Sequence, residues 1–137
     1  MPDNTDLRYL LRRMDPVLNA GTYVFATLPT SLGIAHDDII ASIREPEGLS
    51  VVVDERVAQR EGLVPVFPCA WITLTVHSAL DAVGLTGAFS VALGNAGISC
   101  NVVAGAFHDH IFVPRQRADD AISVLRALQS HDGSVAG

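Results

Sequence analysis

The spacing of apolar and polar residues along the chain changes between a helical period and a strand-like alternation. Four apolar residues near the N-terminus are spaced so that they share one face of a helix, and these are Leu7, Leu10, Leu11 and Met14. They predict a short amphipathic helix that Asp6 caps and that ends before Pro16. The stretch Gly21–Leu28 is rich in β-branched and aromatic residues, so we expect a strand there that Pro29 stops.

A hairpin and a second helix are predicted next. The strand candidates Ile39–Ile43 and Leu49–Val53 are joined by a turn over Arg44–Gly48. Asp54 is placed to cap a short helix, and Gly62 is placed to end it. The first half of the chain is therefore expected to contain a helix, a strand, a hairpin and a helix.

After Val64–Pro68, whose two prolines make it the best candidate for a linker, the pattern repeats in kind. Ala70–Val76 alternates as a strand does. The helix that follows ends at Gly97 and has an apolar stripe of Leu85, Phe89, Ala92, Leu93 and Ala96. A second hairpin is predicted over Ile98–Ala104 and Phe107–Val113. The last helix begins near Pro114 and buries Ala118, Ala121, Ile122, Leu125 and Leu128, and the tail from Ser130 is expected to fray.

These elements predict an α+β protein made of two related halves. The second half, residues 67–137, has the order β-α-β-β-α, and the first half, residues 1–66, is a shorter version of it. A β-α-β-β unit whose helices lie on one face of an antiparallel sheet is the ferredoxin-like arrangement. We therefore expect two such units in tandem, which either share strands or pack together.

The charge of the chain restricts its partners. The formal net charge is −6, which disfavours nucleic acid and anionic membranes, because both are bound largely through basic patches. The chain has no lysine, which excludes a Schiff-base lysine and a phosphate-binding lysine of the Walker type. No apolar stretch approaches the ~20 residues that cross a bilayer, and the first six residues are acidic, unlike a signal peptide. We expect a cytoplasmic protein.

The two cysteines, Cys69 and Cys100, are far apart in the sequence and form no CxxC pair. In the cytosol such residues are expected to be reduced and to act as small core residues. A disulfide between them remains open.

The loop from His77 to Leu85 is the first candidate for a ligand site. Its residues Ser78 and Asp81 have the spacing of a capping box, or Asp81 itself caps a helix that starts near Val83. Glycines at 84 and 87 would weaken the first turn of that helix. Either a ligand such as a carboxylate approaches the backbone closely there, or the glycines allow the helix to pack against the sheet or a neighbouring subunit.

Three further places have two interpretations each. His108 and His110 point to one face of a strand, and with His77 they could bind a metal, although HxH is a weak signal and surface histidines explain it too. The segment Arg44–Gly48 either binds the charged end of a ligand or forms only a turn whose charged side chains are solvated. Asn101 binds a ligand or satisfies the backbone at a strand end. Standard catalytic motifs (GxSxG, GxxxxGK[ST], HExxH and CxxC) are absent from the sequence.

Several short phrases of the sequence resemble those of a known family, the ACT domains. Asp81-Ala82-Val83-Gly84-Leu85 and Asn95-Ala96-Gly97-Ile98-Ser99 look like the ACT phrases that open the first helix and lead into the second strand. Four more phrases resemble small stand-alone bacterial proteins built from two ACT-like halves, and these are Gly21–Phe25, Arg44–Leu49, Leu74–Ser78 and His108–Val113.

The resemblance implies ferredoxin-like βαββαβ units and regulatory binding of a small molecule, typically an amino acid, between paired domains near the first strand-to-helix loop. Carried over to this sequence, it implies a site formed by His77, Ser78, Leu80, Asp81, Val83, Gly84 and Leu85, with Asn101 and Val102 from the facing strand. This chain has Val83 where the ACT pattern often has proline, so the loop is expected to be less rigid.

The leading hypothesis is thus a regulatory ACT-type protein that binds an amino acid or a related metabolite, is not an enzyme, and uses no metal or other cofactor. We also expect self-association, most simply as a homodimer, because unpaired sheet edges need cover. A pure interaction module without a ligand is the first alternative. A metal-dependent enzyme that uses His77, His108 and His110 is the second.

Overall fold

The computed structural model describes residues 6–29 and 33–134 of the 137-residue chain. Two helices and three strands come first, α1 (Leu7–Arg12), β1 (Pro16–Leu28), β2 (Ala41–Glu45), β3 (Gly48–Asp54) and α2 (Glu55–Glu61). The second half contains β4 (Val66–Leu74), α3 (Leu85–Asn95), β5 (Asn101–Ala104), β6 (Asp109–Pro114) and α4 (Ala118–Ser134). Single 3-10 turns lie at His36–Asp38 and Arg115–Arg117.

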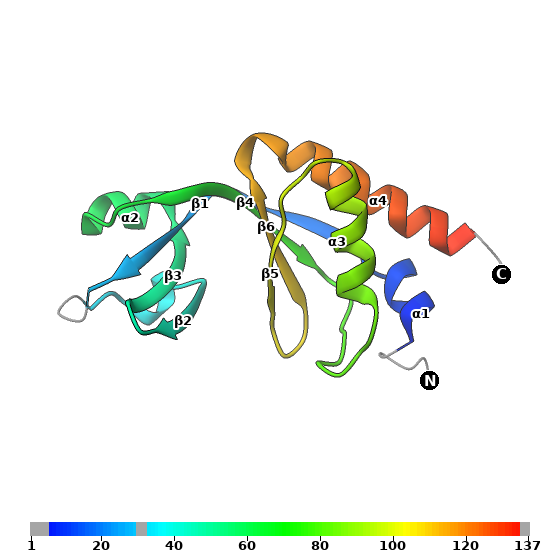
Figure 1. The fold of residues 1–137 in the computed structure, drawn as a ribbon, viewed down its shortest axis with the longest axis horizontal. Helices are drawn as coiled ribbons and strands as arrows, with labels where there is room; N and C mark the ends of the chain where they lie inside the picture. Colours follow the sequence, from blue (N-terminus) through cyan, green and yellow to red (C-terminus); the bar gives the residue numbers. More distant parts are fainter. Residues whose placement is uncertain (1–5, 30–32, 135–137) are drawn as a thin grey trace.

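All six strands form one antiparallel sheet in the order β2-β3-β1-β4-β6-β5. Two overlapping sets of four strands, β2-β3-β1-β4 and β1-β4-β6-β5, each have the ferredoxin-like order. The central strand of each half is therefore also the fourth strand of the other half. The predicted tandem of ferredoxin-like units is confirmed, and of the two arrangements left open the shared sheet is the one that occurs (Figure 1).

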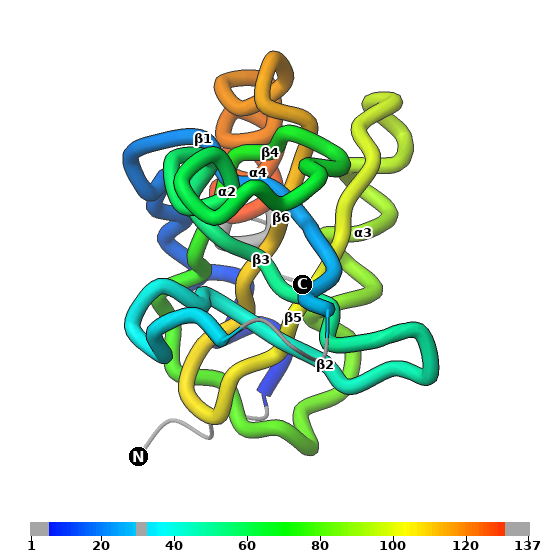
Figure 2. Tube along the Cα trace, turned by 90° about the vertical axis from the view of Figure 1, so that its left-hand side faces the viewer, coloured from blue at the N-terminus to red at the C-terminus, as the bar shows by residue number. Residues whose placement is uncertain are grey.

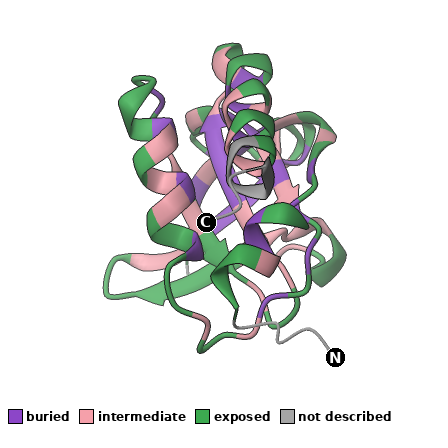
Figure 3. Cartoon of the chain, turned by 90° about the vertical axis from the view of Figure 1, so that its right-hand side faces the viewer, coloured by how far each residue is buried: buried purple, intermediate pink, exposed green. Residues whose placement is uncertain are grey.

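The helices cover one face of the sheet. In the second half, α1, α3 and α4 pack on β4 and β6 around fully buried side chains such as Ile72, Phe89, Leu93 and Leu125. Figure 3 shows the buried residues gathered where these helices meet the sheet. The first half has a smaller core, in which α2 packs on β1 and β3.

The opposite face of the sheet carries aromatic side chains instead of helices. Tyr23 packs edge-on against Trp71 with ring centroids 5.3 Å apart, and Phe25 packs in the same way against Phe112 at 5.8 Å. We call this the open face. Its side chains alternate along the strands with those that point to the helices, because the side-chain period of a strand is two.

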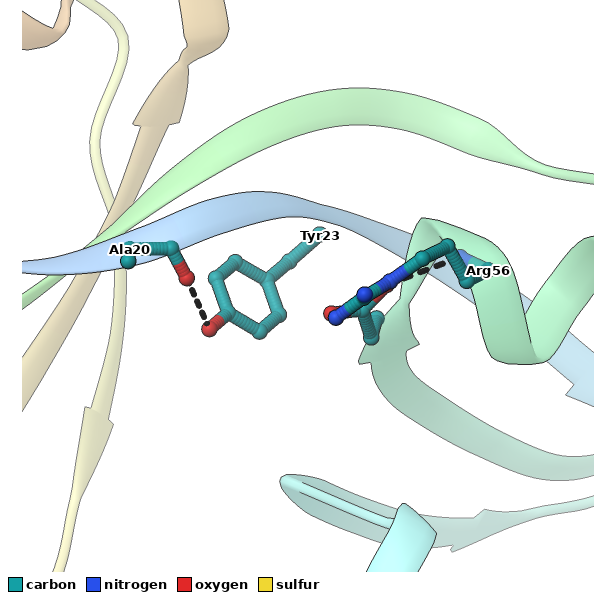
Figure 4. Close-up of polar contacts among 4 residues, drawn as sticks. Ala20, Tyr23 and Arg56 are labelled. Atoms are coloured by element: carbon teal, nitrogen blue, oxygen red, sulfur yellow. Dashed lines mark hydrogen bonds and ion pairs between the residues drawn. The ribbon is translucent and has the colours of Figure 1, made fainter.

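Irregular pairing bends the two central strands. Asn19 pairs with Trp71 but Tyr23 pairs with Cys69, so β1 has extra residues there, and Gly21 has a φ of +108°. The hydroxyl of Tyr23 donates to the carbonyl oxygen of Ala20 at 2.7 Å and ties this bulge together (Figure 4). Bulges bend a strand and increase its twist. In Figure 1 both hairpins, β2–β3 and β5–β6, lie on the same side of the bent strands.

Several local predictions are confirmed. Asp6 and Asp54 each accept a hydrogen bond from a first-turn N–H, at the starts of α1 and α2. Gly62 ends α2 with a φ of +68°, which glycine adopts without strain. Both cysteines are free thiols, and burial raises the pKa of Cys69 to about 12.

Several predictions about element boundaries are wrong. The proposed linker Val64–Pro68 is partly strand, because β4 begins at Val66 and pairs with β1. Strand β1 begins at Pro16, since its first part pairs with β4 rather than with β3. The segment after Ser130, expected to fray, continues α4 to Ser134, and the last three residues lie outside the described part.

The described part of the segment between β1 and β2 holds a 3-10 turn where the second half has helix α3. Helix α1 does not fill this place, since it packs on α3 and α4 of the other half. No helix within the described ranges is both long and apolar enough to span a membrane.

Candidate functional site

The loop between β4 and α3 encloses a small cavity of about 70 Å³. One wall comes from the loop and the start of α3, through Ser78, Ala79, Leu80, Ala82, Leu85 and Thr86. The other wall comes from the β5–β6 hairpin, through Ala104, Gly105 and Asp109. We call this the loop cavity. Ser78 fixes the two walls to each other, because its backbone N–H donates to the carbonyl oxygen of Phe107 at 3.1 Å.

Asp109 supplies a buried carboxylate to the loop cavity. The residue is 8% exposed, and it shares the helix-covered side of β6 with Ile111 and Val113. Within residues 6–29 and 33–130, no group donates a hydrogen bond to its carboxylate. Burial raises the pKa of Asp109, while the nearby charge of His110 acts in the opposite direction. A buried carboxylate of this kind gains from a cationic partner.

The N-terminus of α3 supplies the opposite polarity. Gly84 is the N-cap residue and provides no side-chain cap, so the first N–H groups of the helix have no partner within it. These groups and the helix dipole favour an anion. The cavity thus joins a carboxylate on one wall to the positive end of a helix on the other, and it has room for a few non-hydrogen atoms.

Both predicted roles of Asp81 as a helix cap are wrong. Helix α3 begins at Leu85, later than expected, and Asp81 is exposed on a turn in which the N–H of Ala82 donates to the carbonyl oxygen of Ala79. Tertiary packing decides this start, because Leu85 is buried against the core of the second half.

The backbone conformation and the packing at position 84 explain why this residue is a glycine. Its φ is +104°, a backbone conformation that favours glycine. A Cβ atom there would lie 3.1 Å from Cδ2 of Leu7 in α1. The packing interpretation therefore accounts for Gly84 by itself. At Gly87 a Cβ atom would meet nothing within 4 Å, and the structure shows no reason for that glycine.

The structure brings only part of the predicted site together. Ser78, Leu80 and Leu85 line the loop cavity, and Gly84 lies at its helix end. His77 and Val83 are exposed on the same loop, and the ring of His77 packs beside Phe107. On β5, Asn101 and Val102 do not line the loop cavity, since Ala104, at the other end of that strand, does so.

Sequence reasoning missed Asp109. A signal was present, because residues 109, 111 and 113 alternate as a strand does and place the acid in line with two apolar residues. An acidic residue at a core-facing strand position indicates a buried carboxylate.

The histidines of this region are engaged with the protein itself. Nδ1 of His108 lies 3.1 Å from the carbonyl oxygen of Val76. Nδ1 of His110 accepts a hydrogen bond from Nε1 of Trp71 at 3.0 Å. In the described part of the chain, no group of three or more His, Cys, Asp or Glu side chains is placed to hold a metal ion. Within Arg44–Gly48, Pro46 and Glu47 form the tight turn, and the flanking residues belong to β2 and β3.

Two family models match the chain in tandem, both described as ACT domain, one over residues 2–70 and the other over residues 66–127. The chain belongs to the ACT domain family. Among curated proteins, none matches this ACT protein.

The chain is also similar to several solved structures. A Vibrio cholerae protein of unknown function, described as a possible transport protein, is 46% identical over 90% of this chain and 95% of its own, with a TM-score of 0.77. A protein of Agrobacterium tumefaciens is 21% identical over 83% and 87% of the two chains, with a TM-score of 0.66. The ligand-free regulatory subunit of aspartate kinase from Thermus thermophilus shares the fold at 12% identity, with coverage of 82% and 95% and a TM-score of 0.58.

Proposed function

We propose that this ACT protein is a non-catalytic regulatory protein that binds an amino acid at the loop cavity. The observation that carries the proposal is the buried carboxylate of Asp109 across a small cavity from the uncapped N-terminus of α3. An α-amino acid has the complementary pair of charges on two groups that are bonded to the same carbon atom. Membership of the ACT domain family supports a regulatory role.

In the proposed complex, the ammonium group of the ligand pairs with Asp109 and the ligand carboxylate accepts hydrogen bonds from the first turn of α3. Both interactions form away from bulk water, where charge-assisted hydrogen bonds are strong. The cavity volume of about 70 Å³ accommodates these head groups only. The ligand side chain then lies outside the cavity, against the exposed loop residues Leu80 and Val83.

We further propose that two copies pair over this loop. Leu80 lines the cavity, and the side chains of Val83 on the same loop and of Phe107 on the β5–β6 hairpin are exposed and apolar. A second copy would cover them together with the ligand. We place the protein in the cytoplasm, where its free cysteines would stay reduced.

A thermal-shift panel of amino acids tests the binding proposal. The ligand should stabilise the protein by about 2.7 kcal/mol at roughly 100 times its Kd. Asp109→Asn removes the charge that holds the ammonium group, so this variant should lose the response. Asp81→Asn is the matched control, because Asp81 is an exposed acid on the same loop, and it should respond as the unmodified protein does.

Two results would contradict the proposal. If no amino acid shifts the melting temperature, the chain is better explained as an interaction module. If Asp109→Asn folds and responds as well as the unmodified protein, the site lies elsewhere. Light scattering tests the pairing, since a mass near 14.5 kDa at micromolar concentration would show a monomer.

A further inference from the structure

A second cavity lies on the open face and has a different chemistry. It has a volume of about 320 Å³ and lies between the two edge strands of the sheet. Its lining residues are Phe25 from β1, Ala41, Ser42 and Ile43 from β2, Ser50, Val51 and Val52 from β3, and Val102, Val103 and Ala104 from β5. We call it the edge-strand groove.

The bend of the sheet creates this groove. Strands β2 and β5 lie at opposite ends of the strand order, so in a flat sheet the four other strands would separate them. In this protein both contribute to one groove, and in Figure 2 the β2–β3 hairpin stands in front of β5. Phe25 lines the groove and packs edge-on against Phe112, with ring centroids 5.8 Å apart, and against Phe67, with ring centroids 6.0 Å apart.

The groove contains no charged side chain. Its lining is apolar apart from Ser42 and Ser50, and the hydroxyl of Ser50 already donates to the carboxylate of Glu45. A zwitterion or a phosphate would lose its hydration there without gaining a partner. The volume is typical of the smaller ligand pockets, which span about 300–1,000 Å³.

A folded protein partner fits these observations less well. A stable interface takes about 800 Å² from each partner, whereas this groove lies between edge strands of five and four residues. Short edge strands also disfavour pairing with a strand of another chain. We propose that the edge-strand groove binds a small, uncharged apolar molecule, and an aromatic one suits the ring of Phe25 in its lining. This proposal does not depend on an amino acid in the loop cavity.

The uncharged fluorophore N-phenyl-1-naphthylamine is a suitable probe. Its emission should rise on binding, and it should quench Trp71, which is the single tryptophan of the chain and lies on the same open face. In an amide NMR titration, the shifts should concentrate in residues 41–43 and 102–104.

Two surface variants test the location. Ile43→Glu and Val103→Glu place a carboxylate in the groove at residues that are 64% and 37% exposed, so both should fold. Each should weaken probe binding about ten-fold or more, because a charge there has no partner. Val91→Glu is the control, since Val91 is 62% exposed on α3 and outside the groove, and it should leave probe binding unchanged.

The proposal is overturned if the probe does not bind, or if Val91→Glu weakens binding as much as the groove variants do. It is also overturned if both groove variants bind the probe as well as the unmodified protein. Amide shifts of residues 41–43 and 102–104 that depend on protein concentration without probe would show that a second copy covers the groove, and would equally contradict a small-molecule site.

Discussion

The two halves of this ACT protein each supply three strands to one sheet, in the same order, but their helices cover these strands unequally. Three helices, α1, α3 and α4, pack over the second half, whereas α2, with seven residues, packs over the first. The loop cavity lies in the well-covered half, where the start of a helix meets a sheet edge. The comparison teaches that a repeated strand order does not imply a repeated site. The site needs helix α3, whereas the described part of the corresponding segment in the first half holds a 3-10 turn.

The largest expected effect is the loss of stability when a buried leucine is shortened in either of the two cores. Leu93→Ala removes a fully buried side chain from α3, and it should lower the free energy of unfolding by about 4 kcal/mol, near the upper end for such substitutions. Leu63→Ala in the first half should cost only about 2 kcal/mol, because Leu63 is less deeply buried in a smaller core. Urea denaturation measures both. Equal losses would show that the two cores are equally well packed.

A pair of glycines offers a sharper comparison with a smaller effect. Gly84→Ala should destabilise the protein by about 1–3 kcal/mol, because the position has a positive φ and Leu7 is in the way. Gly62 ends α2 in the first half. It also has a positive φ, but a new Cβ atom there would meet nothing within 4 Å. Gly62→Ala should therefore lower the free energy of unfolding by about 1 kcal/mol. Thermal melts distinguish them. A Gly84→Ala variant more stable than the parent would show that its backbone is not strained.

The smallest effect concerns pH and the open face of the second half. Burial, and then the charge of His108, lower the pKa of His110, while Asp109 acts in the opposite direction. The unfolded chain, with a histidine pKa of about 6.5, therefore binds the proton first as pH falls. Stability from His110 should be complete above that value and should decrease as pH falls toward the lower pKa of the folded protein.

Urea denaturation followed by Trp71 fluorescence between pH 7.5 and 5.5 measures this effect, since Trp71 donates to His110. His110→Gln should lose part of the pH dependence. His36→Gln should keep it, because the His36 side chain is fully exposed in the first half. A parent protein whose stability does not change over this range would contradict the prediction.

Local features of the fold were predictable because their causes lie within a few residues. The caps Asp6 and Asp54 act on the N–H groups two residues later, and Gly62 ends the helix that it directly follows. The alternation in β4 likewise showed which side chains share a face. The start of α3 was misplaced because Leu85 is fixed by the core and not by Asp81.

The sequence by itself determined the ACT-type order of helices and strands and the loop between β4 and α3 as the candidate ligand site. Only the tertiary structure decided that β1 and β4 are shared by both halves, because alternation along a strand does not identify its neighbours. It also decided that Asp109 lines the loop cavity while Asn101 does not. The physical reason is that the burial of a carboxylate depends on which distant helix packs over it. Both strand pairing and helix packing are determined by contacts between residues far apart in the sequence.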